Sequence, residues 1–444
     1  MNPIRFSILI FILLLIYKTT AGQPNWTAIK ANAVFNVADT SYASPIIQPI
    51  NVAGWEDGLY ITRDGRNIYS TYLPVDAFSW LFDLLNNPFC FDFNPYYRPP
   101  LLGIDTVTNI FGCPNYMHSD IVISQRSNAS TPFTSWNNSQ MQASFSLEGG
   151  AQGVLLNQDT FDLFVYTQDG PGTQSTDIKL LRNVPVNPDT VGSVILFGTP
   201  AQEDNPHLER INDSSLVILF DRDRYIYYAT SIDNGISWSV PALINNVIND
   251  QSPYDAQPHL WYDGTDWWVY FCADNNGIRG IYKSKQITSG DWNNWTPKEL
   301  VIEGSMINGG YGTIFGIGEP SLTMWGDLSF VVVYGDSNST DTTDVYDCDP
   351  WILPKKGSPL YINAESSIDA GFRISPQPAY NTLTINSGKI RSASEYFISN
   401  MKGEIVKTGT MNVPGNLSIE ELPVGNYILS FGSIYGNLQF IKMN

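Results

Sequence analysis

A phrase that returns five times along the chain restricts the fold more than any other feature of the sequence. Each copy opens with a slot that is acidic in four of the five copies, continues as an apolar strand, and reaches a polar turn eight or nine residues later. The opening slots are occupied by Glu56, Glu148, Glu203, Asp255 and Ile317. Repetition on this scale predicts a stacked or radial architecture, and it places a carboxylate at the same point of nearly every unit.

The spacing and composition of the copies predict propeller blades. The later copies follow one another after about 50 to 60 residues, which suits blades built from several short strands. Strands such as 215–220 and 267–271 are nearly continuous apolar runs, so they are expected to be buried on both faces. Five copies therefore predict an all-β, five-bladed β-propeller. Because a closed ring leaves no open strand edge, residues 29–37 are expected to supply the outer strand of the last blade.

The chain divides into a large and a small folded part. Residues 23–358 are assigned to the propeller, with residues 75–114 as an inserted loop, because that stretch is rich in Pro, Asn and aromatic residues and does not alternate. Residues 359–371 form a linker. Residues 372–444 contain alternating strands joined by Gly and Asn turns, which predicts a small C-terminal β-sandwich.

The N-terminus predicts export. Arg5 precedes an apolar run over residues 6–17 and then small residues, the pattern of a secretory signal peptide over residues 1–22. That run is short for a membrane span, and no later segment is long and apolar enough, so no transmembrane segment is expected. In an oxidising compartment we expect Cys90 to pair with Cys113, and Cys272 to be a small buried hydrophobe.

Charge and composition limit the partners. The 444 residues carry a net charge of −19, so a polyanion such as nucleic acid is excluded as a partner. Aromatic residues make up 13% of the chain, which suits strand packing and also stacking on sugar rings. Carbohydrate is therefore the expected ligand. No CxxC pair or His-rich cluster indicates a zinc site, and no cofactor is expected.

Carboxylates at the start of the inner strands carry the functional hypothesis. In a propeller these strands line a central channel, so their first residues are expected to converge at one mouth. Glycoside cleavage needs one protonated and one ionised carboxyl group, and crowding raises the pKa of at least one of them. The catalytic candidates are Asp57, Glu203, Asp204 and Glu319, and the substrate-binding candidates are Glu148, His207, Asp255 and His259.

A structural role for the same residues stays open. The acids would then bond backbone amides of the neighbouring blade, or hold a structural calcium ion on the axis. His207 and His259 follow a proline in matching positions, and they either position a substrate hydroxyl or are hydrogen-bonded core imidazoles. Arg63 and Arg66 flank a turn and are expected to face water, and no arginine precedes the first inner strand, which disfavours sialidase chemistry.

Three resemblances bear on the propeller. Ser231, Asp233, Gly235 and Trp238 follow the pattern S-x-D-x-G-x-x-W and resemble the Asp-box of sialidases and other propellers, which implies a capped hairpin turn. The carboxylates look similar to those of five-bladed arabinanases and β-xylosidases, whose base Asp, modulating Asp and acid Glu come from the first three blades. That resemblance implies Asp57 as the base, Glu203 or Asp204 as the modulator or acid, and Glu319 as a further candidate. The second blade departs from the pattern, because Gly149 stands where an Asp would be expected. The phrases also resemble PD40-type repeats, which occur in binding proteins as well as hydrolases.

The last part of the chain resembles the C-terminal sorting domain of proteins exported by the type IX secretion system of Bacteroidetes. The matching elements are Pro376-Gln377-Pro378, the turn at 401–403, the segment 422–427 and the final strand ending at Lys442. The resemblance implies the type IX machinery as a partner, and a secreted or cell-surface location after periplasmic transit. Two functions follow: a secreted enzyme that hydrolyses a glycosidic bond, or a non-catalytic propeller that binds glycan or protein.

Overall fold

The computed structural model describes the chain in ranges separated by gaps. The described residues are 26–51, 55–73, 104–105, 116–117, 119–141, 148–169, 176–223, 225–245, 247–250, 255–275, 278–304, 306–307, 310–311, 314–335, 346–361, 373–376, 379–386, 392–400, 405–431 and 437–443. The predicted signal peptide, almost all of the insertion at 75–114, the Cys90–Cys113 pair and most of the linker at 359–371 lie outside them.

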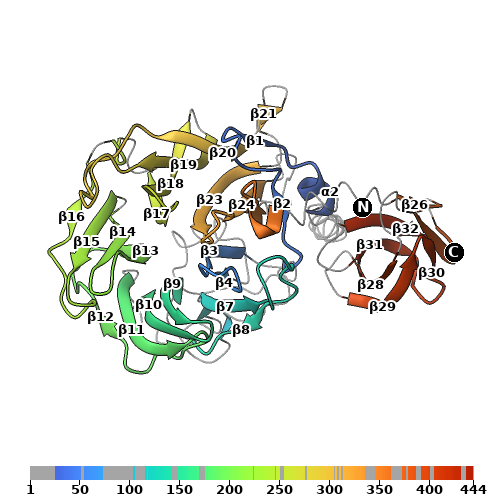
Figure 1. Ribbon diagram of the computed structural model, residues 1–444, viewed down its shortest axis with the longest axis horizontal. Coiled ribbons are helices and arrows are strands. Elements are labelled where there is room, and N and C mark those ends of the chain that lie inside the picture. The colour runs from blue at the N-terminus through green and yellow to red at the C-terminus, as the bar shows by residue number, and fades with distance from the viewer. Residues whose placement is uncertain are drawn as a thin grey trace, which may run out of the picture.

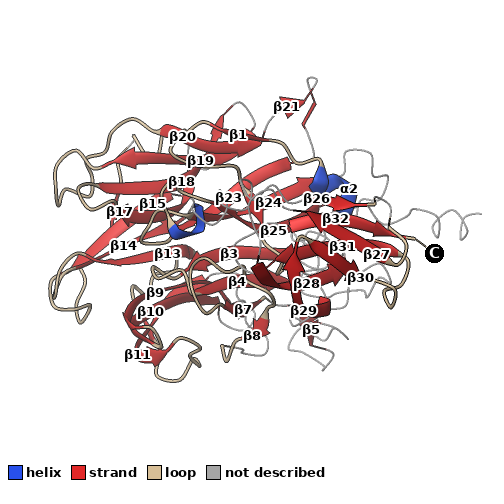
Figure 2. Ribbon diagram, turned by 45° about the vertical axis from the view of Figure 1, so that its right-hand side comes forward, coloured by secondary structure: helices blue, strands red, loops and turns tan. Residues whose placement is uncertain are grey.

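Strands dominate the described chain (Figure 2), and those of the larger part form five four-stranded antiparallel ladders arranged in a ring (Figure 1). The first two ladders are β3 (Trp55–Ile61), β4 (Asn67–Leu73), β7 (Asp120–Gln125) and β8 (Asn137–Asn138), then β9 (Glu148–Asn157), β10 (Thr160–Asp169), β11 (Thr176–Pro185) and β12 (Val194–Ile195). The third is β13 (Glu203–Arg210), β14 (Leu216–Arg222), β15 (Tyr225–Ser231) and β16 (Ala242–Leu243). The fourth is β17 (Ala256–Tyr262), β18 (Trp267–Asn275), β19 (Ile278–Lys285) and β20 (Glu299–Gly304), and the fifth is β23 (Ile314–Leu322), β24 (Leu328–Gly335), β25 (Tyr346–Leu353) and β2 (Ile46–Ile47). The all-β class is confirmed.

The second strands of the third, fourth and fifth ladders contain apolar runs, as predicted. In β14 the residues from Leu216 to Asp221 are all buried, and in β24 the run from Leu328 to Val332 is buried as well. Strands that are covered on both faces by neighbouring ladders need apolar side chains at every position. Cys272 lies in such a strand and is fully buried, as expected.

Every inner strand carries a β-bulge at the same place. The third residue of each phrase has a positive φ, and the strand pairing shifts at that point in all five ladders. These residues are Gly58 (φ 57°), Gly150 (55°), Asn205 (48°), Gln257 (59°) and Glu319 (56°). A bulge bends its strand and redirects the adjoining side chains, and three of these residues are not glycine, where such a conformation is uncommon.

The N-terminal segment corrects one expectation. β1 (Phe35–Val37) pairs with β20 of the fourth ladder, and the outer strand of the fifth ladder is β2 instead. The chain before β1 is the short helix α2 (Trp26–Ala31), whose Lys30 forms ion pairs of 2.8 and 2.6 Å with two aspartates of β25. This anchor holds the segment across the boundary of two ladders, so residues 29–37 do not pair with the last blade.

The turn at 231–238 has the predicted hydrogen bonds. The Ser231 hydroxyl accepts the Gly235 N–H at 2.8 Å, and the Asp233 carboxylate accepts the Ser237 N–H at 2.9 Å. Trp238 packs against the apolar cluster of its ladder. Trp136 and Trp295 occupy the same place, between the third and fourth strands of their ladders, and both are buried.

The smaller part is a β-sandwich. One sheet contains β26 (Arg373–Ser375), β27 (Thr382–Asn386) and β30 (Gly415–Ser418), and the other contains β29 (Ile405–Val413), β28 (Ser392–Asn400), β31 (Gly425–Phe431) and β32 (Asn437–Lys442). Side chains of both sheets meet in one core, among them Leu383, Ile398 and Leu429. No helix within the described ranges has the length and hydropathy of a membrane span.

Candidate active site

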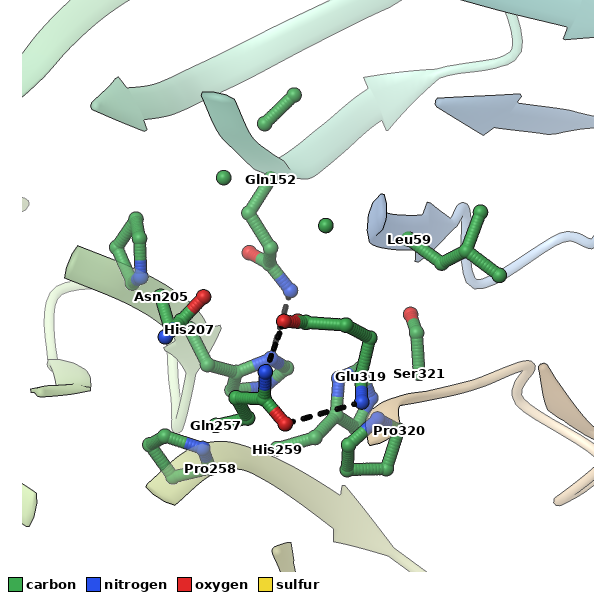
Figure 3. Close-up of a pocket in the computed structure, with 14 residues that line it drawn as sticks. Leu59, Gln152, Asn205, His207, Gln257, Pro258, His259, Glu319, Pro320 and Ser321 are labelled. Atoms are coloured by element: carbon green, nitrogen blue, oxygen red, sulfur yellow. Dashed lines mark hydrogen bonds between the residues drawn. The ribbon is translucent and has the colours of Figure 1, made fainter. Parts of the chain in front are cut away.

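A small cavity lies on the axis of the ring, lined by the inner strands of all five ladders (Figure 3). Its lining comes from the bulges and the residues that follow them: Gly58, Leu59, Gly150, Ala151, Gln152, Asn205, Pro206, His207, Gln257, Pro258, His259, Glu319, Pro320 and Ser321. The volume of about 30 Å³ is large enough for water but not for a sugar ring. A saccharide would therefore have to lie beyond the end of this cavity.

Three of the predicted catalytic residues gather at the carboxylate end of the axis. Asp57 and Asp204 directly precede the bulge residues of β3 and β13, and Glu319 is itself the bulge residue of β23. The negative charges of Asp57 and Asp204 both raise the pKa of Glu319, so the three groups are close enough to interact. The structure thus brings together side chains from the first, third and fifth ladders, as the phrase predicts.

Glu319 is the carboxyl group most strongly held in its neutral form. It is 8% exposed, and its pKa is raised well above the usual range, first by burial and then by Asp57, Asp204 and Asp221. One of its carboxyl oxygens accepts a hydrogen bond from the Gln257 amide, and its backbone N–H donates to the same side chain at 3.3 Å. We infer that Glu319 keeps its proton at neutral pH and is held in one position.

Asp57 and Asp204 are half-buried and are oriented by local donors. Burial raises the pKa of both carboxyl groups, but hydrogen bonds to their ionised forms oppose that shift. Asp57 accepts from the Trp55 indole at 3.1 Å and from the Gly58 N–H at 3.0 Å, and Asp204 accepts from the Asn205 N–H at 2.8 Å. These hydrogen bonds therefore stabilise the ionised forms of both groups.

Asp221 and Arg279 belong to the same cluster, and sequence reasoning missed both. Asp221 ends the apolar run of β14 and accepts hydrogen bonds from the Gln257 N–H at 3.0 Å and the Asn205 amide at 2.7 Å. Burial raises the pKa of Asp221 to about 7. Arg279 of β19 donates to the side-chain oxygen Oε1 of Gln257 at 3.2 Å, and its charge lowers the pKa of Glu319.

A signal for Asp221 was present in the sequence. In the hairpin of β13 and β14 the strands pair Asp204 directly with Asp221, so folding the predicted turn back on itself places the second acid beside the first. No comparable signal identifies Arg279, which lies outside the repeated phrase.

The acids in the opening slot do not reach the channel end. Glu56, Glu148, Glu203 and Asp255 are all fully buried. A carboxyl oxygen of Glu203 accepts from the Arg222 guanidinium at 2.7 Å and from the Thr199 hydroxyl at 3.0 Å. Glu148 accepts from the Gln168 amide at 2.8 Å, and Asp255 lies 3.5 Å from the Lys298 ammonium group.

The reason for this placement is the alternation of a strand. Neighbouring residues of a strand point to opposite faces. The side chain in the opening slot therefore points into the packed interior of the ladders when the side chain in the next slot points toward the axis. The expectation that Glu203, Glu148 and Asp255 converge with the other acids is therefore corrected.

The two histidines lie deeper than the carboxylates and are hydrogen-bonded core side chains. Their ring centroids are 3.9 Å apart, and both rings are buried. His207 shares a 2.7 Å hydrogen bond with the Gln152 amide, and His259 accepts the Leu322 N–H at 3.0 Å. Burial lowers the pKa of both imidazoles, so both are neutral at pH 7. This geometry matches the structural alternative rather than contact with a substrate hydroxyl.

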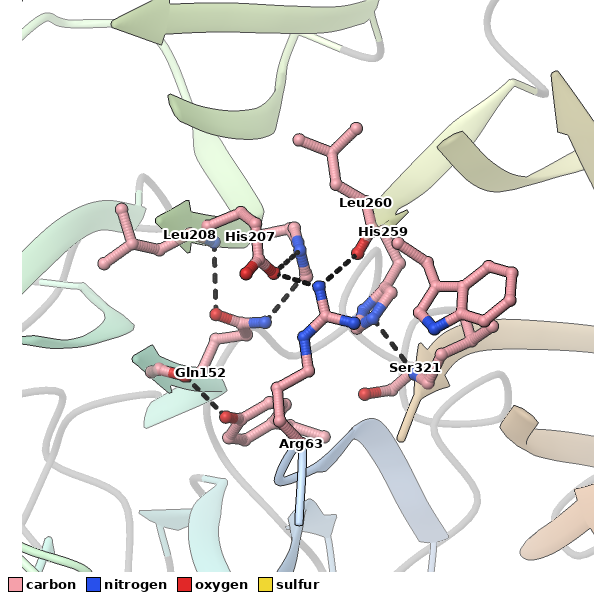
Figure 4. A network of polar contacts seen from close by, with 12 residues as sticks. Arg63, Gln152, His207, Leu208, His259, Leu260 and Ser321 are labelled. Carbon is pink, nitrogen blue, oxygen red and sulfur yellow. Dashed lines mark hydrogen bonds and ion pairs between the residues drawn. The ribbon is translucent and has the colours of Figure 1, made fainter. Parts of the chain in front are cut away.

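The Arg63 side chain extends toward the two histidines at the axis and is hydrogen-bonded there (Figure 4), which corrects the expectation that it faces water. Its guanidinium forms an ion pair with Glu209 of β13 and donates to the Leu260 carbonyl at 3.4 Å. Glu209 in turn lies 3.5 Å from the second nitrogen of His207. Arg66, in contrast, is bonded to Gln158 in an exposed position, as predicted.

The described ranges contain no group of three or more His, Cys, Asp or Glu side chains arranged to hold a metal ion. The structural calcium considered for the axis therefore stays a hypothesis.

Comparisons with known proteins give structural likeness only. No protein-family model matches the sequence, and no curated protein matches it. Among solved structures, the catalytic domain of a Coprinopsis cinerea GH62 α-L-arabinofuranosidase is 10% identical with a TM-score of 0.42, over 71% of this chain and 96% of that one. A GH43 endo-arabinanase from Bacillus licheniformis is 10% identical with a TM-score of 0.37, over 68% and 95%. A Bombyx mori GH32 β-fructofuranosidase is 9% identical with a TM-score of 0.39, over 94% and 91%.

Proposed function

We propose that the protein hydrolyses a glycosidic bond at the carboxylate end of the propeller axis. The observation that carries the proposal is the cluster of Asp57, Asp204, Asp221 and Glu319 at the axis, in which burial and the neighbouring carboxylates raise the pKa of Glu319 well above its usual range. Two carboxyl groups in opposite protonation states at one site are what glycoside cleavage needs.

In this proposal Glu319 is the general acid and Asp57 is the partner carboxylate. Glu319 donates its proton to the glycosidic oxygen as the bond to the leaving sugar breaks. The Trp55 and Gly58 donors stabilise the ionised form of Asp57, which acts on the other face of the sugar ring, and a water molecule supplies the hydroxyl group that replaces the leaving sugar. Asp204 and Asp221 keep the pKa of Glu319 high, and Arg279 balances part of their charge.

A neutral polysaccharide is the proposed substrate class. The chain carries a net charge of −19, and the site itself gathers four carboxyl groups beside one arginine, so an acidic polysaccharide would be repelled. The aromatic content of 13% is consistent with contacts to sugar rings.

A non-catalytic propeller that binds glycan or protein at the same end is the second candidate. One observation favours it: Asp57 and Asp204 each accept a backbone N–H from the next residue, and this bond is also what stabilises a bulge. If that bond is their whole role, substitution would cost stability without touching a reaction.

A screen for hydrolysis separates the two candidates. The purified protein is incubated with arabinan, arabinoxylan, xyloglucan and laminarin, and released reducing ends are measured. Glu319→Gln and Asp57→Asn are compared with Glu203→Gln, a matched change at a fully buried glutamate of the ring interior. Hydrolysis that both cluster variants lose and Glu203→Gln retains supports the enzyme. Hydrolysis that survives Glu319→Gln contradicts the assignment, and binding without hydrolysis supports the second candidate.

For the smaller part we propose the role of an export address for the type IX machinery, with release to the cell surface or medium. The support is the resemblance carried by Pro376, Leu422 and Lys442 with their neighbours. We also propose that the turn at 231–238 is an Asp-box, and the hydrogen bonds of Ser231 and Asp233 support this. Deleting residues 372–444 is expected to leave the protein in the periplasm, and export of the truncated chain would contradict the address.

A further inference from the structure

A second, larger cavity opens at the opposite end of the axis. Its volume is about 830 Å³, within the range of roughly 300–1,000 Å³ that is usual for small-molecule sites. The lining comes from the first, third, fourth and fifth ladders: Arg63, Glu209, Arg210, Ile211, Tyr262, Asp263, Gly264, Thr265, Asp266, Trp267, Gln286, Ile287, Ser289 and Met324. The proposed reaction does not use this cavity, which is called the hairpin cavity because much of its lining comes from the turns that follow the inner strands.

The hairpin cavity is separate from the carboxylate cluster. Along β13 the cluster residue Asp204 is followed by the buried His207 and then by Glu209, which lines the hairpin cavity. Five residues of a strand span roughly 17 Å at about 3.4 Å each. The ion pair between Arg63 and Glu209 belongs to the lining of the hairpin cavity, and the two cavities share no lining residue.

The apolar part of the lining is presented to solvent. Tyr262 is 43% exposed, and its ring lies 5.0 Å from that of Trp267 at an interplanar angle of 38°. Ile287 and Met324 are 57% and 58% exposed. An exposed aromatic surface within a concave site is the feature that stacks on the apolar face of a sugar ring.

The polar part of the lining favours an uncharged ligand. Arg210 is bonded to Asp162 and, at 2.7 Å, to the Asn234 side chain, while Asp266 pairs with Lys285 at 3.0 Å. Arg63 and Glu209 are paired as well, and the Asp263 carboxylate accepts hydrogen bonds from two backbone N–H groups of its own turn and from the Trp268 indole, so a charged ligand would have to displace an existing contact. The Tyr262 hydroxyl and the Trp267 indole N–H, in contrast, make no hydrogen bond to another residue in the described ranges, and both suit sugar hydroxyl groups.

We propose that the hairpin cavity binds a neutral oligosaccharide, with the Tyr262 ring stacked on a sugar and Trp267 beside it. The inference rests on the proposed function for its ligand class, and it adds a second, non-catalytic glycan site at the far end of the axis. Such a site holds a polysaccharide chain near the enzyme, which raises the local substrate concentration.

Binding is measured by titration calorimetry in the Glu319→Gln background, so that the ligand is not cleaved. The probes are arabinopentaose, xylopentaose, cellopentaose and laminaripentaose. Tyr262→Ala is expected to weaken the binding of at least one probe about five- to tenfold, which is the effect of one stacked ring. Tyr225→Ala is the matched control, because Tyr225 is also 43% exposed but lies on β15 outside the cavity, and it is expected to change nothing.

A second variant keeps the test valid if Tyr262→Ala disturbs folding. Met324→Glu places a charge at a side chain that is already 58% exposed, so the fold is expected to tolerate it while ligand binding weakens. Affinity that is unchanged in both cavity variants overturns the proposal. Failure of the Glu319→Gln protein to bind any of the four probes overturns it as well.

Failure of this proposal and failure of the proposed reaction are distinguishable. Probe binding that depends on Tyr262, with no hydrolysis by the wild type, supports the hairpin cavity and contradicts the enzyme. Hydrolysis that is lost in Glu319→Gln, together with probe affinity that is unchanged by Tyr262→Ala, supports the enzyme and overturns the proposal of a glycan site in the hairpin cavity.

Discussion

Adjacent slots of one repeated phrase have opposite environments in this propeller. Glu203 fills the opening slot, is fully buried, and is held by Arg222 and Thr199. Asp204 fills the next slot, is half-buried at the axis, and acts on Glu319 through its charge. Two acids that are neighbours in the sequence therefore have different consequences, one for the cohesion of the ring and one for chemistry at its axis.

The difference teaches that repetition identifies a strand but not the face on which each side chain lies. Alternation sends the opening slot into the ring and the next slot to the axis. The bulge that follows then brings the third slot to the axis as well, which is how Glu319 joins Asp57 and Asp204. A single residue of offset thus separates a structural acid from a candidate catalyst.

The largest expected effect is on hydrolysis. Glu319→Gln removes the proposed general acid, and loss of one such group lowers kcat by roughly 10²–10⁴-fold. Glu203→Gln is expected to leave kcat unchanged, because its side chain does not reach the axis. Equal losses in the two variants, measured on the folded proteins, would erase the distinction between the slots.

The next effect is on the pH dependence of stability. The pKa of Asp221 is about 7 in the folded protein, chiefly because of burial, whereas an unfolded Asp titrates at about 3.9. Between those values the folded protein holds a proton that the unfolded chain has lost. The contribution of Asp221 to the free energy of unfolding therefore falls as pH rises from about 4 to about 7, and this contribution levels off above that.

Asp221→Asn is expected to reduce the fall in unfolding free energy between about pH 4 and about pH 7 by about 2–4 kcal/mol. Urea unfolding at a series of pH values measures this. Glu203→Gln serves as the control and is expected to keep the slope. A variant of Asp221 with the slope of the wild type would show that this carboxyl group titrates normally.

A smaller effect is expected from the opening slot. Glu203→Gln weakens a charge-assisted contact with Arg222, which is itself partly exposed, so the expected cost is about 1–3 kcal/mol of unfolding free energy. Replacing Arg222 by Met in the same protein is expected to recover part of that loss, because no charge is then left without its partner. An additive double variant would argue against the pairing.

The smallest effect tests the bulge. Gly58→Ala keeps a positive φ of 57° and brings the new Cβ against the Thr71 side chain. Gly192 also has a positive φ, 82°, but no neighbour within 4 Å, so Gly192→Ala carries the backbone cost alone. The loss of unfolding free energy, measured by thermal unfolding, is expected to be about 1 kcal/mol larger for Gly58→Ala than for Gly192→Ala. Equal losses of unfolding free energy in the two variants would mean that the backbone at the bulge shifts readily to make room for the new Cβ atom.

Much of the fold follows from local pattern, and the rest depends on contacts between distant segments. The apolar runs of β14 and β18 and the turns after them are visible in the sequence, as are Asp57, Asp204 and Glu319 in matching copies. The pairing of β1 with the fourth ladder depends on Lys30 reaching β25, which no periodicity encodes. The sequence places Arg63 beside a turn and predicts that it faces water, yet its long side chain forms an ion pair with Glu209 of the third ladder.

The account rests on the proposal that the Glu319 carboxyl group at the axis stays protonated at neutral pH. Infrared difference spectroscopy measures this without a substrate, by comparing the carboxyl bands of the wild type, Glu319→Gln and Glu203→Gln at pH 7. The account predicts that Glu319→Gln removes part of the protonated-carboxyl component that the wild type and Glu203→Gln both show, while the part due to Asp221 remains. A spectrum whose protonated component is unaffected by Glu319→Gln would contradict it.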